Sequence, residues 1–269
     1  MFKPVKRIWR YFVTLSLMCL LFLTGCAQSS TPAPSATPKL RIAAAADLTL
    51  AFKEIATQFE QETNIPTEIT FGSTGTTAMQ IENGAPYDIF AAADVLYVDK
   101  LNQKGLIITD TQQLYAQGRI GIASLKGNPL SIKGLDDLAN NPMVKKIAIA
   151  EPSHAPYGKA AKQALEYRNL WTKVEQKMVY GQNIQDTLAI LKSGNVDVAI
   201  IALSIYKADE VEFTLIDGSW HDPLNQAMAI LKTTKQEDNA RQFMAYVHEE
   251  EGREIMKKYG FLLPGEFVK

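Results

Sequence analysis

From residue 40 onward, short apolar runs alternate with longer stretches in which apolar residues recur every three or four positions. Residues 48–64 place Leu48, Phe52 and Phe59 on one helical face. Runs such as KIAIA (146–150) are typical of buried parallel strands. The predicted strands are 40–46, 65–71, 88–93, 119–124, 146–150 and 196–203, and the predicted helices include 48–64, a segment through Met79 and Ile81, 159–167 and 184–193. This alternation predicts an α/β fold with parallel-rich sheets.

The first 38 residues follow a different pattern. Four basic and no acidic residues lie among the first ten, and an apolar stretch follows at 11–23, shorter than the roughly 20 residues that a membrane span needs. This layout predicts a secretory signal peptide over residues 1–25. The sequence LTGC that ends at Cys26 resembles the lipobox of bacterial lipoproteins, which implies lipidation of Cys26. Residues 26–38 lack apolar bulk and are predicted to form a flexible tether.

Charge and cysteine content limit the possible partners and cross-links of the protein. The whole chain has a net charge of −1, and removing the basic signal leaves 24 basic and 29 acidic residues. An acidic balance argues against nucleic acid as a partner. Cys26 is the only cysteine after the signal, so no intramolecular disulfide is expected.

Four predicted strand-to-helix junctions are rich in small and hydroxyl residues: AAAADLT (43–49), FGSTGTT (71–77), EPSHAPYG (151–158) and VYGQNIQ (179–185). Open α/β sheets bind ligands at the carboxyl ends of their strands, and helix N-termini there favour anions. Hydroxyl and amide donors predominate at these junctions. They therefore predict a site for a small anion, although helix capping is the simpler interpretation of Asp47 and of FGSTGTT taken alone.

From about residue 40 to 264 the chain resembles the molybdate-binding proteins of ABC transporters, most specifically in FGSTGTTAMQIENGAPYDIFAAAD (71–94) and EGREIMKKYGFLLP (251–264). The resemblance implies a two-lobed periplasmic-binding-protein (type II) fold with two crossover strands as a hinge. We expect the crossovers near residues 118–124 and 227–231. The lobes are then 39–120 with 226–269, and 121–225.

The same resemblance implies a non-enzymatic receptor without a cofactor or a bound metal ion. Its ligand is molybdate or tungstate, held through the oxygens, and its partners are an ABC transporter permease and ATPase. We expect an exported monomer, lipid-anchored to the cell envelope membrane on its periplasmic or extracellular face. Carried over residue by residue, the oxyanion contacts fall on Ala46, Asp47, Ser73, Thr74, Tyr157 and Ile184.

Two positions depart from the family pattern. Some relatives have a tyrosine where this chain has Ala202, and Tyr157 is the substitute we expect. Relatives commonly place Ser, Thr or Asn at the position of Asp47, and a carboxylate there repels a dianion. Either the Asp47 side chain turns away and only its amide binds, or the ligand carries a proton, which favours hydrogen phosphate or a similar oxyanion.

A Ser/His hydrolase is the alternative from another class, because His154 lies in one of the four junctions. A GxSxG nucleophile motif is missing from the sequence, and the histidines lack metal-ligand spacing such as HxxxH. We therefore favour binding over catalysis.

Overall fold

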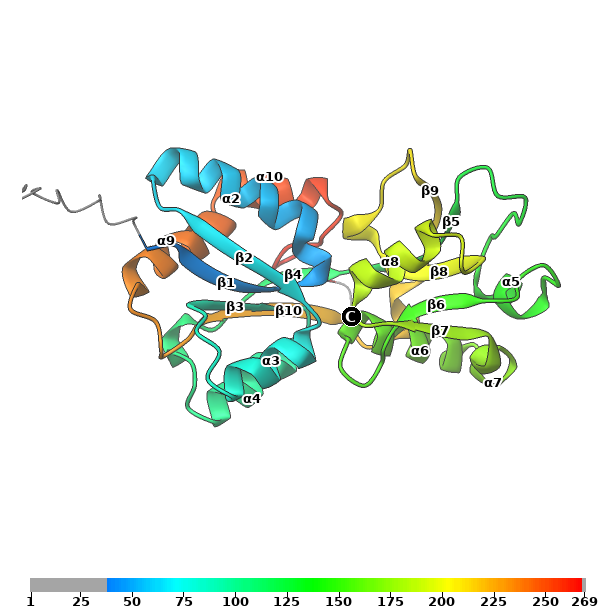
Figure 1. The fold of residues 1–269 in the computed structure, drawn as a ribbon, viewed down its shortest axis with the longest axis horizontal. Coiled ribbons are helices and arrows are strands. Elements are labelled where there is room, and N and C mark those ends of the chain that lie inside the picture. The colour runs from blue at the N-terminus through cyan, green and yellow to red at the C-terminus, as the bar shows by residue number, and fades with distance from the viewer. Residues whose placement is uncertain (1–37, 268–269) are drawn as a thin grey trace, which may run out of the picture. The chain divides into compact units, whose positions relative to one another are not determined.

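The computed structural model describes residues 38–267, which form two lobes, each built on a five-stranded sheet (Figure 1). The first sheet has the strand order β2-β1-β3-β10-β4, and the second has the order β7-β6-β8-β5-β9. In each sheet four strands run in one direction. The single opposing strand is β10 in the first sheet and β5 in the second. The predicted parallel-rich α/β architecture is confirmed, with one antiparallel strand in each sheet.

The strands of the first sheet are β1 (Leu40–Ala45), β2 (Thr67–Gly72), β3 (Ile89–Ala92), β4 (Gln113–Gly118) and β10 (Leu224–Ile230). Those of the second sheet are β5 (Ile120–Leu125), β6 (Ile147–Ala150), β7 (Met178–Gly181), β8 (Val198–Ala202) and β9 (Val211–Leu215).

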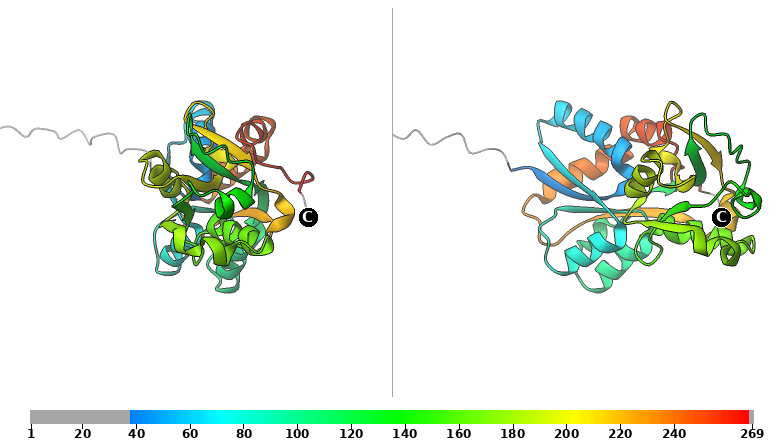
Figure 2. Two further views of the ribbon diagram at one scale, coloured as in Figure 1. Left: turned by 90° about the vertical axis from the view of Figure 1, so that its right-hand side faces the viewer. Right: turned by 45° about the vertical axis from the view of Figure 1, so that its right-hand side comes forward.

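Helices cover both faces of each sheet (Figures 1 and 2). Around the first sheet lie α2 (Thr49–Thr63), α9 (Glu237–His248) and α10 (Glu250–Lys258) on one face, and α3 (Thr74–Glu82) and α4 (Val95–Gln103) on the other. The second lobe contains α5 (Leu135–Asn140), α6 (Pro156–Tyr167), α7 (Trp171–Val174) and α8 (Ile184–Lys192). Short 3-10 turns are η2 (Ala46–Leu48), η3 (Thr109–Thr111), η4 (Glu175–Lys177), η5 (Leu203–Ile205) and η6 (Gly218–Trp220).

The apolar face predicted for residues 48–64 forms part of the core. Phe52 and Phe59 are fully buried and pack edge-on against Phe243 of α9. Edge-to-face contacts of this kind contribute about 0.5–1.5 kcal/mol beyond area burial. The apolar face predicted from the sequence is thus the face that α2 buries.

The chain crosses between the lobes twice. The first crossing is at Arg119, between β4 and β5, within the region predicted. The second lies between η6 and Leu224, where β10 begins. Our expectation of a crossing near residues 227–231 was wrong, because Ala227–Ile230 pair with β3 inside the first sheet. The apolar run of a fully buried strand does not differ from that of a crossing strand, so hydrophobicity alone could not locate it.

The predicted signal peptide and Cys26 lie outside the described residues. Within residues 38–267, no helix combines the length and the apolar character required to span a bilayer.

Candidate functional site

The four junctions predicted from the sequence meet around one small cavity between the lobes. They follow β1 and β2 in the first lobe and β6 and β7 in the second. The cavity is lined by Ala45, Ala46, Asp47, Gly72, Ser73, Thr74, Ala93, Ala155, Pro156, Tyr157 and Ile184. All six predicted oxyanion-contact residues are therefore brought together. None of these lining residues is a lysine or arginine.

Three of the lining residues occupy the first turns of helices. Thr74 and Ile184 are the first residues of α3 and α8, and Tyr157 is the second residue of α6. Backbone N–H groups in a first turn have no partner within their own helix. At α8 the Asn183 side chain caps the N–H groups of Gln185 and Asp186, which leaves the N–H of Ile184 outside that cap. These amides and the helix dipoles make the cavity suited to an anion.

The Thr74 side chain is a hydroxyl donor at the cavity. It is buried, and its Oγ1 accepts a hydrogen bond of 3.1 Å from the backbone N–H of Ala93. Because that bond uses an oxygen lone pair, the hydroxyl proton is left for another acceptor. Thr74 can therefore donate to a ligand oxygen.

Ser73 does not act as a helix cap, contrary to the simpler interpretation of this loop. Residue 73 is the N-cap position of α3, but its side chain makes no capping hydrogen bond. Its Oγ instead lies 2.7 Å from the carbonyl oxygen and 2.9 Å from Nδ1 of His154, in the other lobe. The single hydroxyl proton is therefore used between the lobes, and Ser73 holds them together.

Asp47 is also not a cap. Its side chain is buried, and Oδ2 accepts hydrogen bonds from the Tyr157 hydroxyl at 2.9 Å and from Nε2 of Gln226 at 2.7 Å. Its backbone carbonyl accepts from the Ser204 hydroxyl of η5 at 2.9 Å. Among the described residues, Oδ1 is buried without a hydrogen-bond partner. One carboxyl oxygen is thus fully engaged and the other is left unpaired.

Burial raises the pKa of Asp47 from 3.8 to about 6. The hydrogen bonds from Gln226 and Tyr157, together with the nearby backbone N–H of Asp47 itself, favour the ionised form and offset part of this effect. The change corresponds to a difference of about 3 kcal/mol between the two protonation states. Asp47 therefore titrates close to neutral pH.

Tyr157 lines the cavity, and its hydroxyl is hydrogen-bonded to Asp47. Its hydroxyl donates to Oδ2 of Asp47 and accepts from Nε2 of Gln226 at 3.0 Å. Burial, followed by the nearby Asp47 charge, raises the pKa of Tyr157 well above 10. In this arrangement the hydroxyl proton is donated to Asp47. The direct oxyanion contact expected of Tyr157 therefore stays a prediction.

Sequence reasoning missed Gln226, Tyr115 and Ser204. Tyr115 of β4 donates to Oε1 of Gln226 at 2.8 Å, which fixes the amide that faces Asp47. These residues lie far from Asp47 along the chain and in no recognisable motif. The one signal available in the sequence was a glutamine within the mostly apolar run 224–230. If such a run is buried, the amide requires hydrogen-bond partners.

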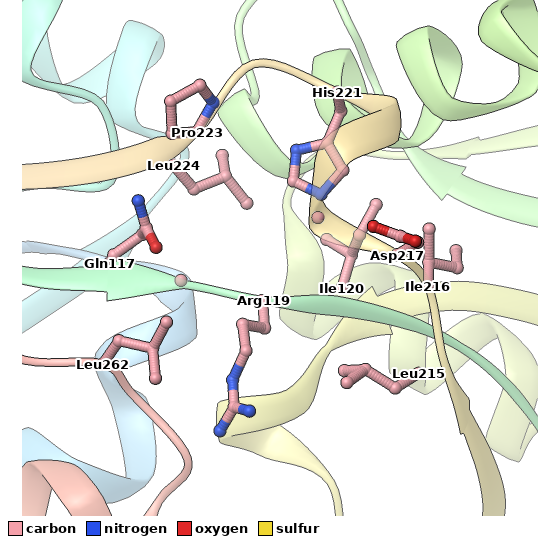
Figure 3. A pocket seen from close by; sticks show the side chains of 12 residues that line it. Gln117, Arg119, Ile120, Leu215, Ile216, Asp217, His221, Pro223, Leu224 and Leu262 are labelled. Carbon is pink, nitrogen blue, oxygen red and sulfur yellow. The ribbon is translucent and has the colours of Figure 1, made fainter. Parts of the chain in front are cut away.

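A larger cavity, about 320 Å³ in volume, lies beside the two crossings (Figure 3). Its charged groups are already engaged. The Arg119 guanidinium donates to the Gly260 carbonyl at 2.7 and 3.0 Å, and the Asp217 carboxylate accepts from Ser219. The small cavity, where free donors converge, is therefore the better candidate for ligand binding.

The Ser73–His154 contact is the pair that a Ser/His hydrolase requires. Such an enzyme also needs a group that orients the histidine base. Among the described residues, the side-chain hydrogen bond of His154 is to Ser73 itself. The same part of the chain contains no group of three or more His, Cys, Asp or Glu side chains arranged to hold a metal ion.

Comparison with known proteins agrees with this architecture. Residues 40–262 match the family of bacterial extracellular solute-binding proteins. The chain belongs to this family of binding proteins.

Several of the similar proteins are named for molybdate. The molybdate-binding protein ModA of Azotobacter vinelandii is 30% identical over 253 residues, covering 93% of this chain and 99% of that protein. ModA of Escherichia coli K12 is 29% identical over 233 residues, covering 84% and 89%. The solved structure of the Azotobacter vinelandii periplasmic molybdate-binding protein superimposes with a TM-score of 0.79 at 29% identity, covering 84% of this chain and all of that one.

Proposed function

We propose that this protein is an extracytoplasmic receptor that binds molybdate and delivers it to the permease and ATPase of an ABC transporter. One observation carries the proposal. Helix N-termini from both lobes converge on a small cavity lined by neutral donors. The similarity to molybdate-binding relatives over most of the chain supports the same ligand.

The chemistry of the cavity suits an oxyanion. Each hydrogen bond to a charged group contributes roughly 1.5–3 kcal/mol, so several amide and hydroxyl donors together offset the dehydration of a dianion. Fixed neutral donors also discriminate by geometry. Binding through both lobes links ligand capture to closure about the two crossings.

Tungstate, which has nearly the same size and shape, is the second ligand we expect. We further propose that the exported protein is a monomer tethered through lipid on Cys26. Replacing Cys26 by Ser should move the protein from the membrane fraction to the soluble fraction. Retention in the membrane fraction would contradict the lipid anchor but not the ligand.

Titration calorimetry of residues 27–269 with molybdate, tungstate, sulfate and phosphate tests the ligand. We expect heat of binding with molybdate and tungstate. Heat with phosphate and none with molybdate would overturn the proposal.

A further inference from the structure

The two oxygens of the Asp47 carboxyl group have different environments. Oδ2 accepts two hydrogen bonds, at 2.9 and 2.7 Å, whereas Oδ1 is buried and has no partner within residues 38–267. A neutral carboxylic acid has this asymmetry, because its carbonyl oxygen accepts two bonds and its hydroxyl donates one. Asp47 lines the cavity, and Oδ1 is its one carboxyl oxygen without a hydrogen-bond partner among the described residues.

An ionised Asp47 conflicts with an anion in this cavity. Two unit charges 4 Å apart interact by about 4 kcal/mol at an effective dielectric constant near 20, and a dianion doubles this repulsion. The cavity lining has no lysine or arginine to offset it. A proton on Oδ1 removes the repulsion and adds a donor.

We propose that Asp47 binds the oxyanion as a neutral carboxylic acid, with the Oδ1 hydroxyl donating to a ligand oxygen, so that capture of a dianion takes up one proton. This inference rests on the proposed function and specifies how the site recognises its ligand. The proton comes from solvent, bonds to Oδ1, and returns to solvent when the anion leaves.

The other groups around Asp47 cannot be the ones that take up this proton on binding. Two tyrosines face it, Tyr157 from α6 and Tyr115 from β4, and both have a pKa well above 10 because of burial. Gln226 of β10 and Ser204 of η5 are neutral. The pKa of Asp47 is about 6 without a ligand, so at pH 8 the carboxyl is ionised and must regain its proton on binding. His154 contacts Ser73 beside the cavity and is the group to control for.

Calorimetry with sodium molybdate, repeated in buffers of different ionisation enthalpy, measures the proton uptake. At pH 8 we expect uptake of about one proton, and between pH 7 and 9 a Kd that rises by up to about tenfold per pH unit. Asp47→Asn should bind molybdate without proton uptake, because its amide donates in place of the acid. His154→Gln should leave the proton uptake unchanged.

The outcomes separate this inference from the proposed function. Molybdate binding with no proton uptake and a constant Kd overturns the role of Asp47 while the receptor function stands. Loss of the uptake in a His154→Gln variant that still binds molybdate overturns it as well. If wild-type protein binds phosphate but not molybdate at any pH, both proposals fail. The wild-type measurement is decisive even if Asp47→Asn does not fold.

Discussion

The backbone N–H of Gly75 donates a 2.9 Å hydrogen bond to the carbonyl oxygen of His154, across the boundary between the lobes. Ser73 bonds to the same carbonyl oxygen. The first turn of α3 therefore rests directly on the junction before α6. This contact sets how closely the donors of the two lobes approach each other around the cavity.

Gly75→Ala should weaken molybdate binding by about tenfold or more. The added Cβ would lie 2.7 Å from the His154 carbonyl oxygen and 3.0 Å from its Cα, so the lobes cannot close as far. Alanine favours a helix over glycine by up to about 1 kcal/mol, which offsets part of the lost contact between the lobes, so the Tm without ligand should fall only slightly. Calorimetry and thermal unfolding measure the two effects.

Gly134→Ala is the matched control for Gly75→Ala. Its Cβ meets nothing within 4 Å, and its affinity should equal that of the wild type. If Gly75→Ala binds molybdate as tightly as the wild type, binding does not require the lobes to come as close together as the Gly75–His154 hydrogen bond brings them.

Thr74→Val should lower molybdate affinity more than Ser73→Ala does. The Thr74 hydroxyl has a proton free for the ligand, whereas the Ser73 proton is used on His154. Loss of one hydrogen bond to an anion costs roughly 1.5–3 kcal/mol, which is about a 10- to 150-fold change in Kd. Thr57→Val, on the exposed face of α2, is the control. If Ser73→Ala lowers the affinity more than Thr74→Val does, Ser73 is the residue whose hydroxyl donates to the ligand.

Tyr157→Phe tests whether this hydroxyl acts on the ligand or on Asp47. It removes a donor that favours ionised Asp47, so the pKa of Asp47 should rise further. The decline of affinity with pH should then begin at a higher pH, with affinity at pH 6 close to that of the wild type. A uniform loss at every pH would indicate direct contact with the anion. Tyr180→Phe, at an exposed position of β7, controls for loss of a tyrosine hydroxyl.

Asp47 should make the ligand-free protein less stable as pH rises. Because its folded pKa is about 6 and its ordinary value 3.8, the folded state holds the proton more tightly between these pH values. Stability therefore falls through this window by up to about 3 kcal/mol and is constant above it. For a protein of this size, that corresponds to roughly 6–12 °C in Tm.

The measurement compares wild type with Asp47→Asn by thermal unfolding from pH 4 to 8. The other carboxylates are common to both proteins, so their effects cancel in the difference. We expect the Tm of the wild type to fall relative to that of the variant between pH 4 and 6.5. Parallel curves would mean that Asp47 keeps its ordinary pKa.

The sequence by itself determined the architecture and the four junctions. Periodic apolar residues specify strands and helices locally, and strand direction in a parallel sheet then places every strand-to-helix junction at the same edge. The junctions that contain Thr74 and Ile184 were identified in this way, whereas the two residues themselves were carried over from the resemblance to the molybdate-binding proteins. The helix α4 and the strands β4 and β9 were not predicted, although Val211, Phe213 and Leu215 of β9 alternate as strand residues do.

Only the tertiary structure decided what the polar side chains at the junctions contact. Ser73 and Asp47 are residue types that often cap helices. Their partners are instead His154 for Ser73, and Tyr157 and Gln226 for Asp47, which lie 81 to 179 residues away along the chain. A carboxyl group is ionised or neutral according to its burial and its donors. Both depend on how the two lobes pack together, and no local pattern of residues encodes that packing.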